Sequence, residues 1–394
     1  MPRPARTPSS RESRSSSRAL LLVLVALGLG LPGGLRAQFT PFQAALAEFD
    51  AEVAAGVADD GAGAISVAVF RGDEVVWARG WGWADIDDGV PAGVQTIGRT
   101  GSISKTVTAV LMMQLVERGL IELDGSVAEH LPEILELEDP PVDPATLTFR
   151  QLASHTAGLE REPGLEGAAS GPIQRWEEKV VASIPTTGFR TPPGTEYAYS
   201  NIGFGMLGLA LSRAAGVPFT ELVETLILRP LGMDDSFFVL EDPEHIRRMS
   251  VGYARNRRTG EVSAARATAE HFGRGYKVPN GGVYSTVEDM AAFAAGLLGA
   301  SEVEILSEAS REAMRTPQSP AEGYGLGLSI RAEEGVTRVG HGGSVAGYNA
   351  RLVFDPASGL GVAMLRTTGW NPPVDELLAA LVRAEGSGAP SPTR

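Results

Sequence analysis

The feature of this sequence that most limits its possible folds is the placement of strand-like segments at both ends of the chain, with helical segments between them. Near the N-terminus two strand-like segments, Ala64–Phe70 and Glu74–Ala84, are joined by a short turn. Near the C-terminus, further strand-like segments occupy residues 324–331, 335–343, 349–355 and 360–367. The simplest arrangement is one antiparallel sheet that combines strands from both ends.

The helical segments complete this prediction. Residues 40–57 and 373–384 have helical spacing, and the middle of the chain consists mostly of helical segments separated by Pro- and Gly-rich loops. We therefore expect an α/β (α+β) fold in which helices flank the sheet and a mostly helical domain is inserted, with a ligand cleft between the two parts. The predicted domain spans 38–385, with a sheet subdomain at about 38–104 and 311–385 and a helical subdomain at about 105–310.

The two ends of the chain differ from this domain. Residues 1–37 have an arginine-rich start, an apolar run at Ala19–Leu31 and small Ala37 at the end, which is typical of an export signal. The run is shorter than the roughly 20 residues that span a bilayer. We expect a removed signal, a periplasmic or secreted protein and no stable membrane insertion afterwards; an uncleaved anchor is the alternative. Residues 386–394 are polar and are expected to form a disordered tail.

Composition excludes several classes of partner and cofactor. Removal of residues 1–37 takes away six Arg and one Glu, which moves the net charge from −14 to −19. Such a surface repels phosphate backbones, so a nucleic-acid partner is not expected. The chain has no cysteine, and its five histidines lack the close spacing of a zinc site. We predict neither a metal nor another cofactor, and the sequence leaves the oligomeric state open.

Ser102 and Lys105 are the first candidates for chemistry. They stand three positions apart where a helix begins, so the hydroxyl and the amine can share a face. Lys105 is one of three lysines in an otherwise arginine-rich chain, and an apolar helix follows it. Burial and the helix dipole would lower the pKa of this lysine. A neutral amine beside a serine activates a nucleophile; the alternative is a capping serine beside an exposed lysine.

Tyr199 and Asn201 form a second candidate pair, just before a glycine-rich apolar helix. The phenol of Tyr199 can act as an acid or a base if a nearby cation such as Lys105 lowers its pKa. The amide of Asn201 can bind a substrate carbonyl or amide. Taken alone, the pair also fits a loop tyrosine followed by a helix cap.

A third candidate segment ends a strand and contains His341, Gly342, Gly343 and Ser344. Its glycines let the backbone approach a ligand closely. Backbone N–H groups there can form an oxyanion hole together with the N–H of Ser102. Taken alone, the segment also fits an ordinary glycine-rich strand end.

The order S-x-x-K, Y-x-N and a K-T-G-like tripeptide resembles the serine β-lactamase and penicillin-binding-protein superfamily, above all its class C-like branch of β-lactamases, D-aminopeptidases, D-Ala-D-Ala carboxypeptidases and family VIII carboxylesterases. The resemblance covers about residues 45–370 and rests on the ordered set rather than on one motif. Flanking stretches are similar as well: residues 77–85, Thr146–Leu159, Arg229–Phe238 and Pro279–Phe293.

The resemblance implies an exported serine hydrolase that works through an acyl-enzyme on an ester, amide or peptide substrate. Ser102 would be the acylated nucleophile, Lys105 its proton acceptor and Tyr199 the proton shuttle. Asn201 would orient the substrate and Lys105. The N–H groups of Ser102 and Ser344 would hold the oxyanion, and the strand edge from His341 to Gly343 would bind the substrate.

The sequence departs from the family in the third motif, where His341-Gly342-Gly343 replaces K-T-G. The fixed positive charge for a substrate carboxylate is then absent, because histidine is mostly neutral at pH 7. We therefore expect an esterase or D-amino-acid peptide hydrolase rather than an efficient β-lactamase. One alternative is a catalytically weak binder of cell-wall peptides or proteins. Another is a Ser-His-Asp esterase that uses His155, for which we instead predict a packed or hydrogen-bonded role.

Overall fold

A computed structural model of the chain describes residues 40–60, 63–255, 258–318, 320–321, 323–367 and 370–388. The predicted signal and residues 389–394 of the predicted tail lie outside these residues. All described residues belong to one compact unit.

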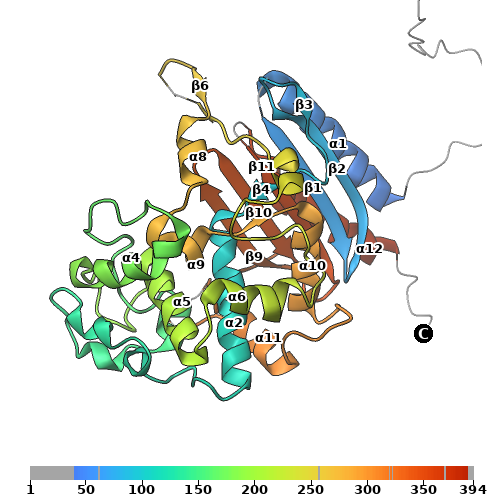
Figure 1. The fold of residues 1–394 in the computed structure, drawn as a ribbon. Helices are drawn as coiled ribbons and strands as arrows, with labels where there is room; N and C mark the ends of the chain where they lie inside the picture. Colours follow the sequence, from blue (N-terminus) through green and yellow to red (C-terminus); the bar gives the residue numbers. More distant parts are fainter. Residues whose placement is uncertain are drawn as a thin grey trace, which may run out of the picture. The chain divides into compact units, whose positions relative to one another are not determined.

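The main sheet has the strand order β3–β2–β1–β11–β10–β9–β8, and every neighbouring pair is antiparallel. Figure 1 shows the N-terminal strands, in blue, beside the C-terminal strands, in red. The strands are β1 Ala64–Arg71, β2 Glu74–Asp85, β3 Val90–Pro91, β8 Ser329–Glu333, β9 Val336–Val345, β10 Tyr348–Phe354 and β11 Leu360–Arg366. The prediction of one antiparallel sheet assembled from both ends of the chain is confirmed.

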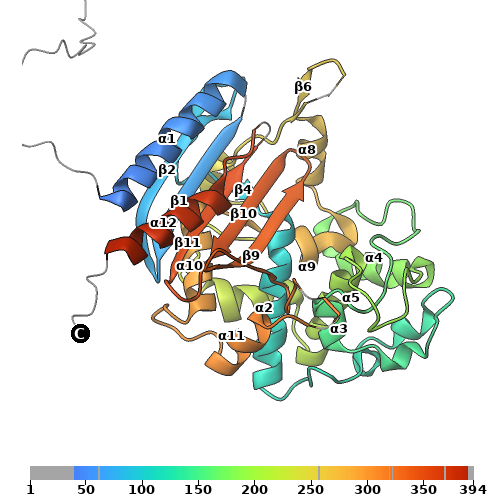
Figure 2. The ribbon, with the colours of Figure 1, turned by 180° about the vertical axis from the view of Figure 1, so that it is seen from behind.

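Helices α1 (Pro41–Asp60) and α12 (Val374–Gly388) cover one face of this sheet (Figure 2). Strand β1 supplies the core on both faces through its alternating side chains. Val67 and Val69 pack with the α1–α12 layer, whereas Ala68 and Phe70 pack into the larger core on the opposite side. A strand buried on both faces explains why Ala64–Phe70 is almost continuously apolar.

The other helices lie on the opposite side and beyond it, where α10 packs on β1 and β11. They are α2 Ser104–Glu117, α3 Phe149–Ala153, α4 Trp176–Ser183, α5 Asn201–Ala215, α6 Phe219–Val223, α7 Pro243–Arg248, α8 Ala265–Glu270, α9 Val278–Gly281, α10 Val287–Leu298 and α11 Glu308–Arg315. Two short pairs of strands complete the description: β4 Gly98–Arg99 with β7 Tyr284–Ser285, and β5 Ala254–Arg255 with β6 Val262–Ser263.

Helix α2 positions the candidate site. Every residue from Ser104 to Leu115 is buried, because α5, α6 and α9 surround the helix. A helix enclosed in this way needs no polar face, and it carries Lys105 into the interior. The chain enters α2 through the 3₁₀ turn η1, Gly101–Ile103, after Thr100 N donates to Val283 O at 3.0 Å.

Two predicted boundaries were wrong. Strand β8 begins at Ser329 rather than at 324, because the glycine-rich stretch before it turns beneath α2: Gly327 has φ +67°, and a Cβ there would lie 2.6 Å from that of Ala109. Helix α12 extends to Gly388, so it includes the first residues of the predicted tail.

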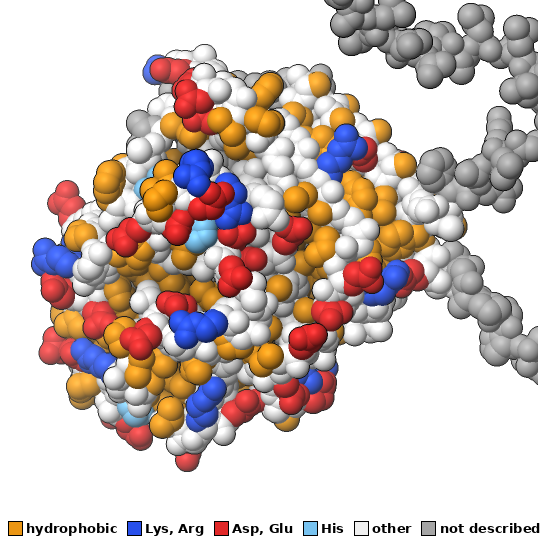
Figure 3. Space-filling view, turned by 45° about the vertical axis from the view of Figure 1, so that its right-hand side comes forward, with side chains coloured by type: hydrophobic (Ala, Val, Ile, Leu, Met, Phe, Trp, Pro, Cys, Tyr) orange, Lys and Arg blue, Asp and Glu red, His pale blue; other side chains and the backbone are white. Residues whose placement is uncertain are grey.

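Figure 3 shows that basic side chains on one face mostly lie next to acidic ones, in keeping with an ion-paired surface. Within the part of the chain that the structure describes, no single helix is long and apolar enough to cross a membrane. One bent pair, α5 with Phe219–Leu228, passes the same test by length and composition alone.

Close packing of α5 on α9 gives a stability prediction. A Cβ at Gly208 would lie 2.3 Å from Cγ of Pro279, whose ring cannot move aside. Alanine gains about 1 kcal/mol over glycine in a helix, but overpacking of this kind costs about 1–3 kcal/mol. We expect Gly208→Ala to be destabilised by up to about 2 kcal/mol in urea denaturation. Gly93→Ala is the control, since its Cβ meets nothing within 4 Å; equal stability of both variants would contradict the packing.

Candidate active site

The structure brings Ser102, Lys105 and Tyr199 into one cluster. Lys105 Nζ lies 3.2 Å from Ser102 Oγ, and the Tyr199 hydroxyl donates to Ser102 Oγ at 2.9 Å. Ser102 lies in η1, Lys105 in the first turn of α2, and Tyr199 just before α5. The i, i+3 spacing and the Y-x-N motif therefore meet at a single hydroxyl group.

The partners of Lys105 indicate where its protons lie. Besides Ser102 Oγ, the amine contacts Asn201 Oδ1 at 2.8 Å and the backbone oxygen of Asn280 at 3.2 Å. Both oxygens can only accept, so they take two N–H donors. A neutral amine has two donors and one lone pair, and the lone pair is then left for the hydroxyl proton of Ser102. The contacts therefore accommodate an uncharged Lys105.

The surroundings of Lys105 favour this neutral form. The side chain is fully buried, and burial lowers its pKa well below the usual value; the charges of Arg274, Arg161 and Lys277 lower it further. Glu162 acts in the opposite direction and does not reverse the shift. An amine that is uncharged near neutral pH can serve as a proton acceptor.

Asn201 is held in one orientation by Glu162. Asn201 Nδ2 donates to Glu162 Oε1 at 2.6 Å, which leaves Oδ1 to face Lys105. The other Glu162 oxygen receives the Tyr276 hydroxyl and, at 2.9 Å, the ammonium of Lys277. Burial opposes the charge of Glu162, but these hydrogen bonds outweigh it and lower the pKa of the carboxyl group. Glu162 thereby fixes which end of the amide Lys105 meets.

The expected lowering of the Tyr199 pKa is wrong. Burial raises the pKa of this phenol, and neither its hydrogen bond to Ser102 nor the nearby Arg161 cancels that effect. The predicted cation at Lys105 cannot help, because the amine is itself driven to the neutral form. Tyr199 therefore remains a protonated donor in this structure.

His155 supports Tyr199 from both neighbouring residues. Its backbone oxygen accepts from Ala198 N at 2.8 Å, its Nδ1 accepts from Ser200 N at 3.1 Å, and its ring lies 4.2 Å from the Tyr199 ring. His155 is buried, with the rare backbone angle φ +61°. Its Nδ1 lone pair is occupied by the peptide N–H, so this geometry fits the predicted packed and hydrogen-bonded role rather than that of a base for Ser102.

The third predicted segment lies on β9, directly against η1. A Cβ at Gly343 would lie 1.9 Å from Thr100 O and 3.1 Å from Ser102 N, and one at Gly101, where φ is +53°, would lie 2.8 Å from Ser344 N. Only glycine permits this contact. It brings the backbone N–H groups of Ser102 and Ser344 near each other, as an oxyanion hole requires.

His341 differs from its neighbours because its side chain is buried. Nε2 lies 3.0 Å from the Tyr324 hydroxyl and Nδ1 lies 2.6 Å from the oxygen of Gly342. Burial lowers the pKa of His341 to about 3. The side chain thus supplies no positive charge, while Gly342, Gly343 and Ser344 line a cavity together with Ser102.

Two cavities open on either side of Ser102. One, of about 340 Å³, is also lined by Asn201, Arg274 and Lys277; the other, of about 530 Å³, starts at Gly342–Ser344 of β9 and extends across β10, where it reaches Arg351. Arg161 and Ser344 line both. Ser102 therefore lies where two arms of a cleft meet.

The sequence did not reveal several residues of this site: Arg161, Glu162, Arg274, Lys277 and Asn280. One signal was available, since Lys277 is one of only three lysines and it ends up with Lys105 in the same cluster. The contribution of Asn280 comes from its backbone, which side-chain identity does not encode.

An antiparallel sheet flanked by helices, with a Ser–Lys–Tyr cluster beside one strand, matches the serine β-lactamase and penicillin-binding-protein superfamily. A family model described as Beta-lactamase matches residues 49–386, and the chain belongs to this family of serine hydrolases.

Individual relatives agree with this assignment. The D-alanyl-D-alanine-carboxypeptidase/endopeptidase AmpH of Escherichia coli (strain K12) is 30% identical over 233 residues, which cover 58% of this chain and 56% of AmpH. The match thus spans about half of that relative. The octameric penicillin-binding protein homologue from Pyrococcus abyssi has a TM-score of 0.71 and 26% identity, over 86% of this chain and 77% of that one. The D-amino acid amidase from Ochrobactrum anthropi SV3 shares the fold, with a TM-score of 0.72 and 21% identity over 88% of this chain and all of its own.

The protonation state of Lys105 can be tested through stability. The unfolded chain holds a proton on this lysine below its usual pKa of 10.5, whereas burial lowers the pKa of Lys105 in the folded chain, which loses the proton at a lower pH. Wild-type stability should therefore rise with pH in the window below 10.5, relative to Lys105→Met, by up to about 1.4 kcal/mol per pH unit.

Urea denaturation of both proteins at about pH 8 and pH 9 measures this difference. A difference that stays flat, or that falls as pH rises, would show that Lys105 is charged in the folded protein.

Proposed function

We propose that this chain hydrolyses esters or amides through an acyl-enzyme on Ser102. The observation that carries the proposal is the position of Ser102 Oγ between the Tyr199 hydroxyl, at 2.9 Å, and the buried amine of Lys105, at 3.2 Å. A nucleophile, a proton acceptor and a proton donor thus meet at one atom. A simple binding site needs none of these contacts.

Acylation follows from the proton positions. Ser102 gives its hydroxyl proton to the lone pair of Lys105, and Oγ forms a bond to the substrate carbonyl carbon. The carbonyl oxygen becomes an oxyanion beside the N–H groups of Ser102 and Ser344. When the bond to the leaving group breaks, Tyr199 donates its proton to the leaving nitrogen or oxygen and recovers one from Lys105, so that Lys105 is neutral again.

Deacylation reverses these transfers with water. The water proton passes to Lys105 by way of Tyr199, while the hydroxide oxygen bonds to the acyl carbon. Ser102 Oγ leaves as the tetrahedral intermediate collapses and takes a proton back from Lys105. The protons move only between protein groups that already contact one another and the reacting atoms of the substrate or water, which limits reorganisation.

The proposed substrate class rests on one side chain of β9. Its side chain at position 341 is a buried, neutral histidine that cannot bind the carboxylate of a penicillin by charge. We therefore propose that the protein is an esterase or a D-amino-acid peptide hydrolase and that it hydrolyses β-lactams poorly. The carboxypeptidase named among the relatives, AmpH, supports the peptide option.

A nucleophile test comes first. We expect a fluorescent phosphonate to label the wild type, and Ser102→Ala to abolish both labelling and turnover, because no other hydroxyl of the described residues hydrogen-bonds to Lys105. A panel of p-nitrophenyl esters, D-amino-acid p-nitroanilides and nitrocefin identifies the substrate. Labelling that persists in Ser102→Ala would refute the assignment, and efficient nitrocefin turnover would refute the proposed selectivity.

His155 provides a second test. Loss of its acceptor for Ser200 N should displace Tyr199, and a displacement of about 1 Å can lower rates about 100-fold. We expect His155→Ala to lower kcat about 10- to 100-fold, with a smaller effect on KM. Asparagine tolerates positive φ and offers an acceptor oxygen, so His155→Asn should recover part of the rate. Equal and complete loss in both variants would instead mark His155 as the base.

A further inference from the structure

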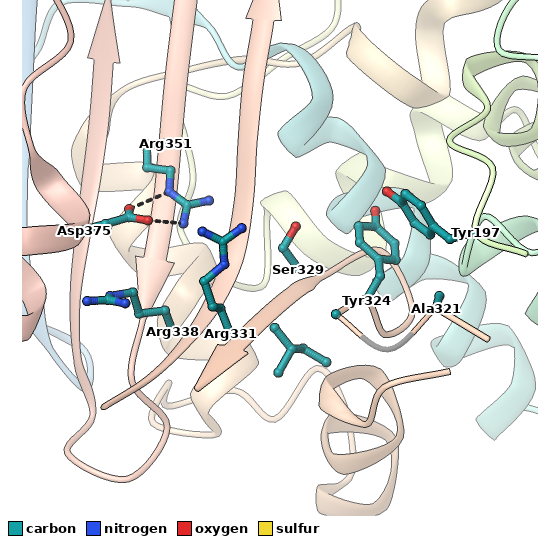
Figure 4. A pocket seen from close by; sticks show the side chains of 10 residues that line it. Tyr197, Ala321, Tyr324, Ser329, Arg331, Arg338, Arg351 and Asp375 are labelled. Carbon is teal, nitrogen blue, oxygen red and sulfur yellow. Dashed lines mark hydrogen bonds and ion pairs between the residues drawn. The ribbon is translucent and has the colours of Figure 1, made fainter. Parts of the chain in front are cut away.

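A cavity of about 570 Å³ lies next to the β9 arm of the active site. Figure 4 shows the heads of Arg331, Arg338 and Arg351 gathered with Asp375 on one side, and the rings of Tyr197 and Tyr324 on the other. The two tyrosine rings have centroids 5.5 Å apart. The acyl transfer proposed above does not use this cavity.

The cavity lining carries an excess of positive charge. Asp375 is occupied by Arg351, which it meets through two hydrogen bonds of 2.7 Å. Arg338 pairs at 2.9 Å with Glu333, a residue that does not line the cavity. Arg331 is exposed, and no carboxylate of the described residues pairs with it. In a chain with 48 acidic and 34 basic residues, an arginine without a carboxylate partner in such a cavity is a locally attractive point for an anion.

The cavity borders the β9 cavity that Ser102 lines. Arg351 and Asp375 line both this cavity and the β9 cavity that contains Ser102. Strand β8 begins opposite Gly340, so β9 from His341 to Val345 extends beyond the part that pairs with β8, while it stays paired with β10 on its other edge. Arg331 pairs in register with Arg338, six positions before Ser344. At about 3.4 Å per residue, the path from Ser102 to Arg331 is roughly 20 Å long.

We propose that this cavity is an accessory site for a carboxylate group of an elongated substrate, with Arg331 as its charged contact. The proposal rests on the hydrolase function proposed above. The planar guanidinium group matches a carboxylate in geometry, and the two tyrosines offer flat surfaces for the chain that carries it. The substrate would lie along β9 from Ser102, with its acidic group about 20 Å from the bond that is cleaved.

Matched substrates test this site. Each pair consists of two substrates that differ only at the end of an extended linker. One member ends in a carboxylate and the other in the corresponding amide. The linkers place this group about 10 or about 20 Å from the scissile carbonyl. One set carries the linker on the acyl side and a second set carries it on the leaving group. The acid-to-amide ratio of kcat/KM is measured for wild type, Arg331→Ala, Arg331→Lys and Arg118→Ala. Arg118 is an exposed arginine at the far end of α2 and serves as the control.

For the longer linker in one of the two sets, we expect the wild type to prefer the acid through a lower KM. Arg331→Ala should reduce the ratio about 3- to 10-fold, the size of a partly exposed ion pair. Arg331→Lys should keep part of the preference, Arg118→Ala all of it, and added salt should weaken it. A ratio near one in both wild-type sets, or a ratio unchanged in Arg331→Ala, overturns the accessory site.

The two proposals fail in different ways. Turnover of the amide substrates that disappears in Ser102→Ala upholds the hydrolase, whatever the acid-to-amide ratio. If no substrate is turned over, binding of the acidic and amide peptides to Ser102→Ala by calorimetry decides the accessory site alone. Tighter binding of the acidic peptide that is lost in the Ser102→Ala, Arg331→Ala double variant supports it, and equal binding refutes it.

Discussion

The chemistry proposed for this protein depends on one buried amine, that of Lys105, which has no carboxylate in contact among the described residues. Lys105 meets two oxygens that only accept and one hydroxyl group, contacts that a neutral amine satisfies with its two N–H donors and its lone pair. The fold maintains this state by enclosing α2 on all sides. Removal of the amine from water and its activation as a base are therefore the same event.

The contact between η1 and β9 brings together two distant parts of the chain. It places the two N–H groups proposed for the oxyanion hole, those of Ser102 and Ser344, close to each other. Gly101 and Gly343 leave room for backbone to touch backbone. The sheet makes this contact rigid, because β9 is paired with β10 along its length from Val339 to Val345. The sharp turn at His155 plays a comparable part for Tyr199, at the cost of a strained φ.

Sequence patterns predicted the parts of this structure that follow local rules. Alternation and turn residues located the strands, and the i, i+3 rule placed Ser102 beside Lys105. The strand boundary at Ser329 was missed because glycines that turn beneath α2 resemble a strand in composition. Glu162 and the upward shift in the Tyr199 pKa were missed because both depend on what surrounds a residue from other segments. A motif gives the spacing of its residues but not their burial, and burial is what shifts the pKa of Tyr199.

The accessory cavity suggests how the position of a positive charge can change substrate selectivity within one fold. A charge on β9 beside the nucleophile favours compact substrates whose carboxylate lies near the reacting carbonyl. Here that position is a neutral histidine held by Tyr324, and the arginine without a carboxylate partner stands further along, at Arg331. A charge about 20 Å away contributes little to a compact ligand, because it lies beyond the Debye length at physiological salt. It can contribute only to a ligand long enough to reach it, so distance alone would separate extended acidic substrates from compact ones.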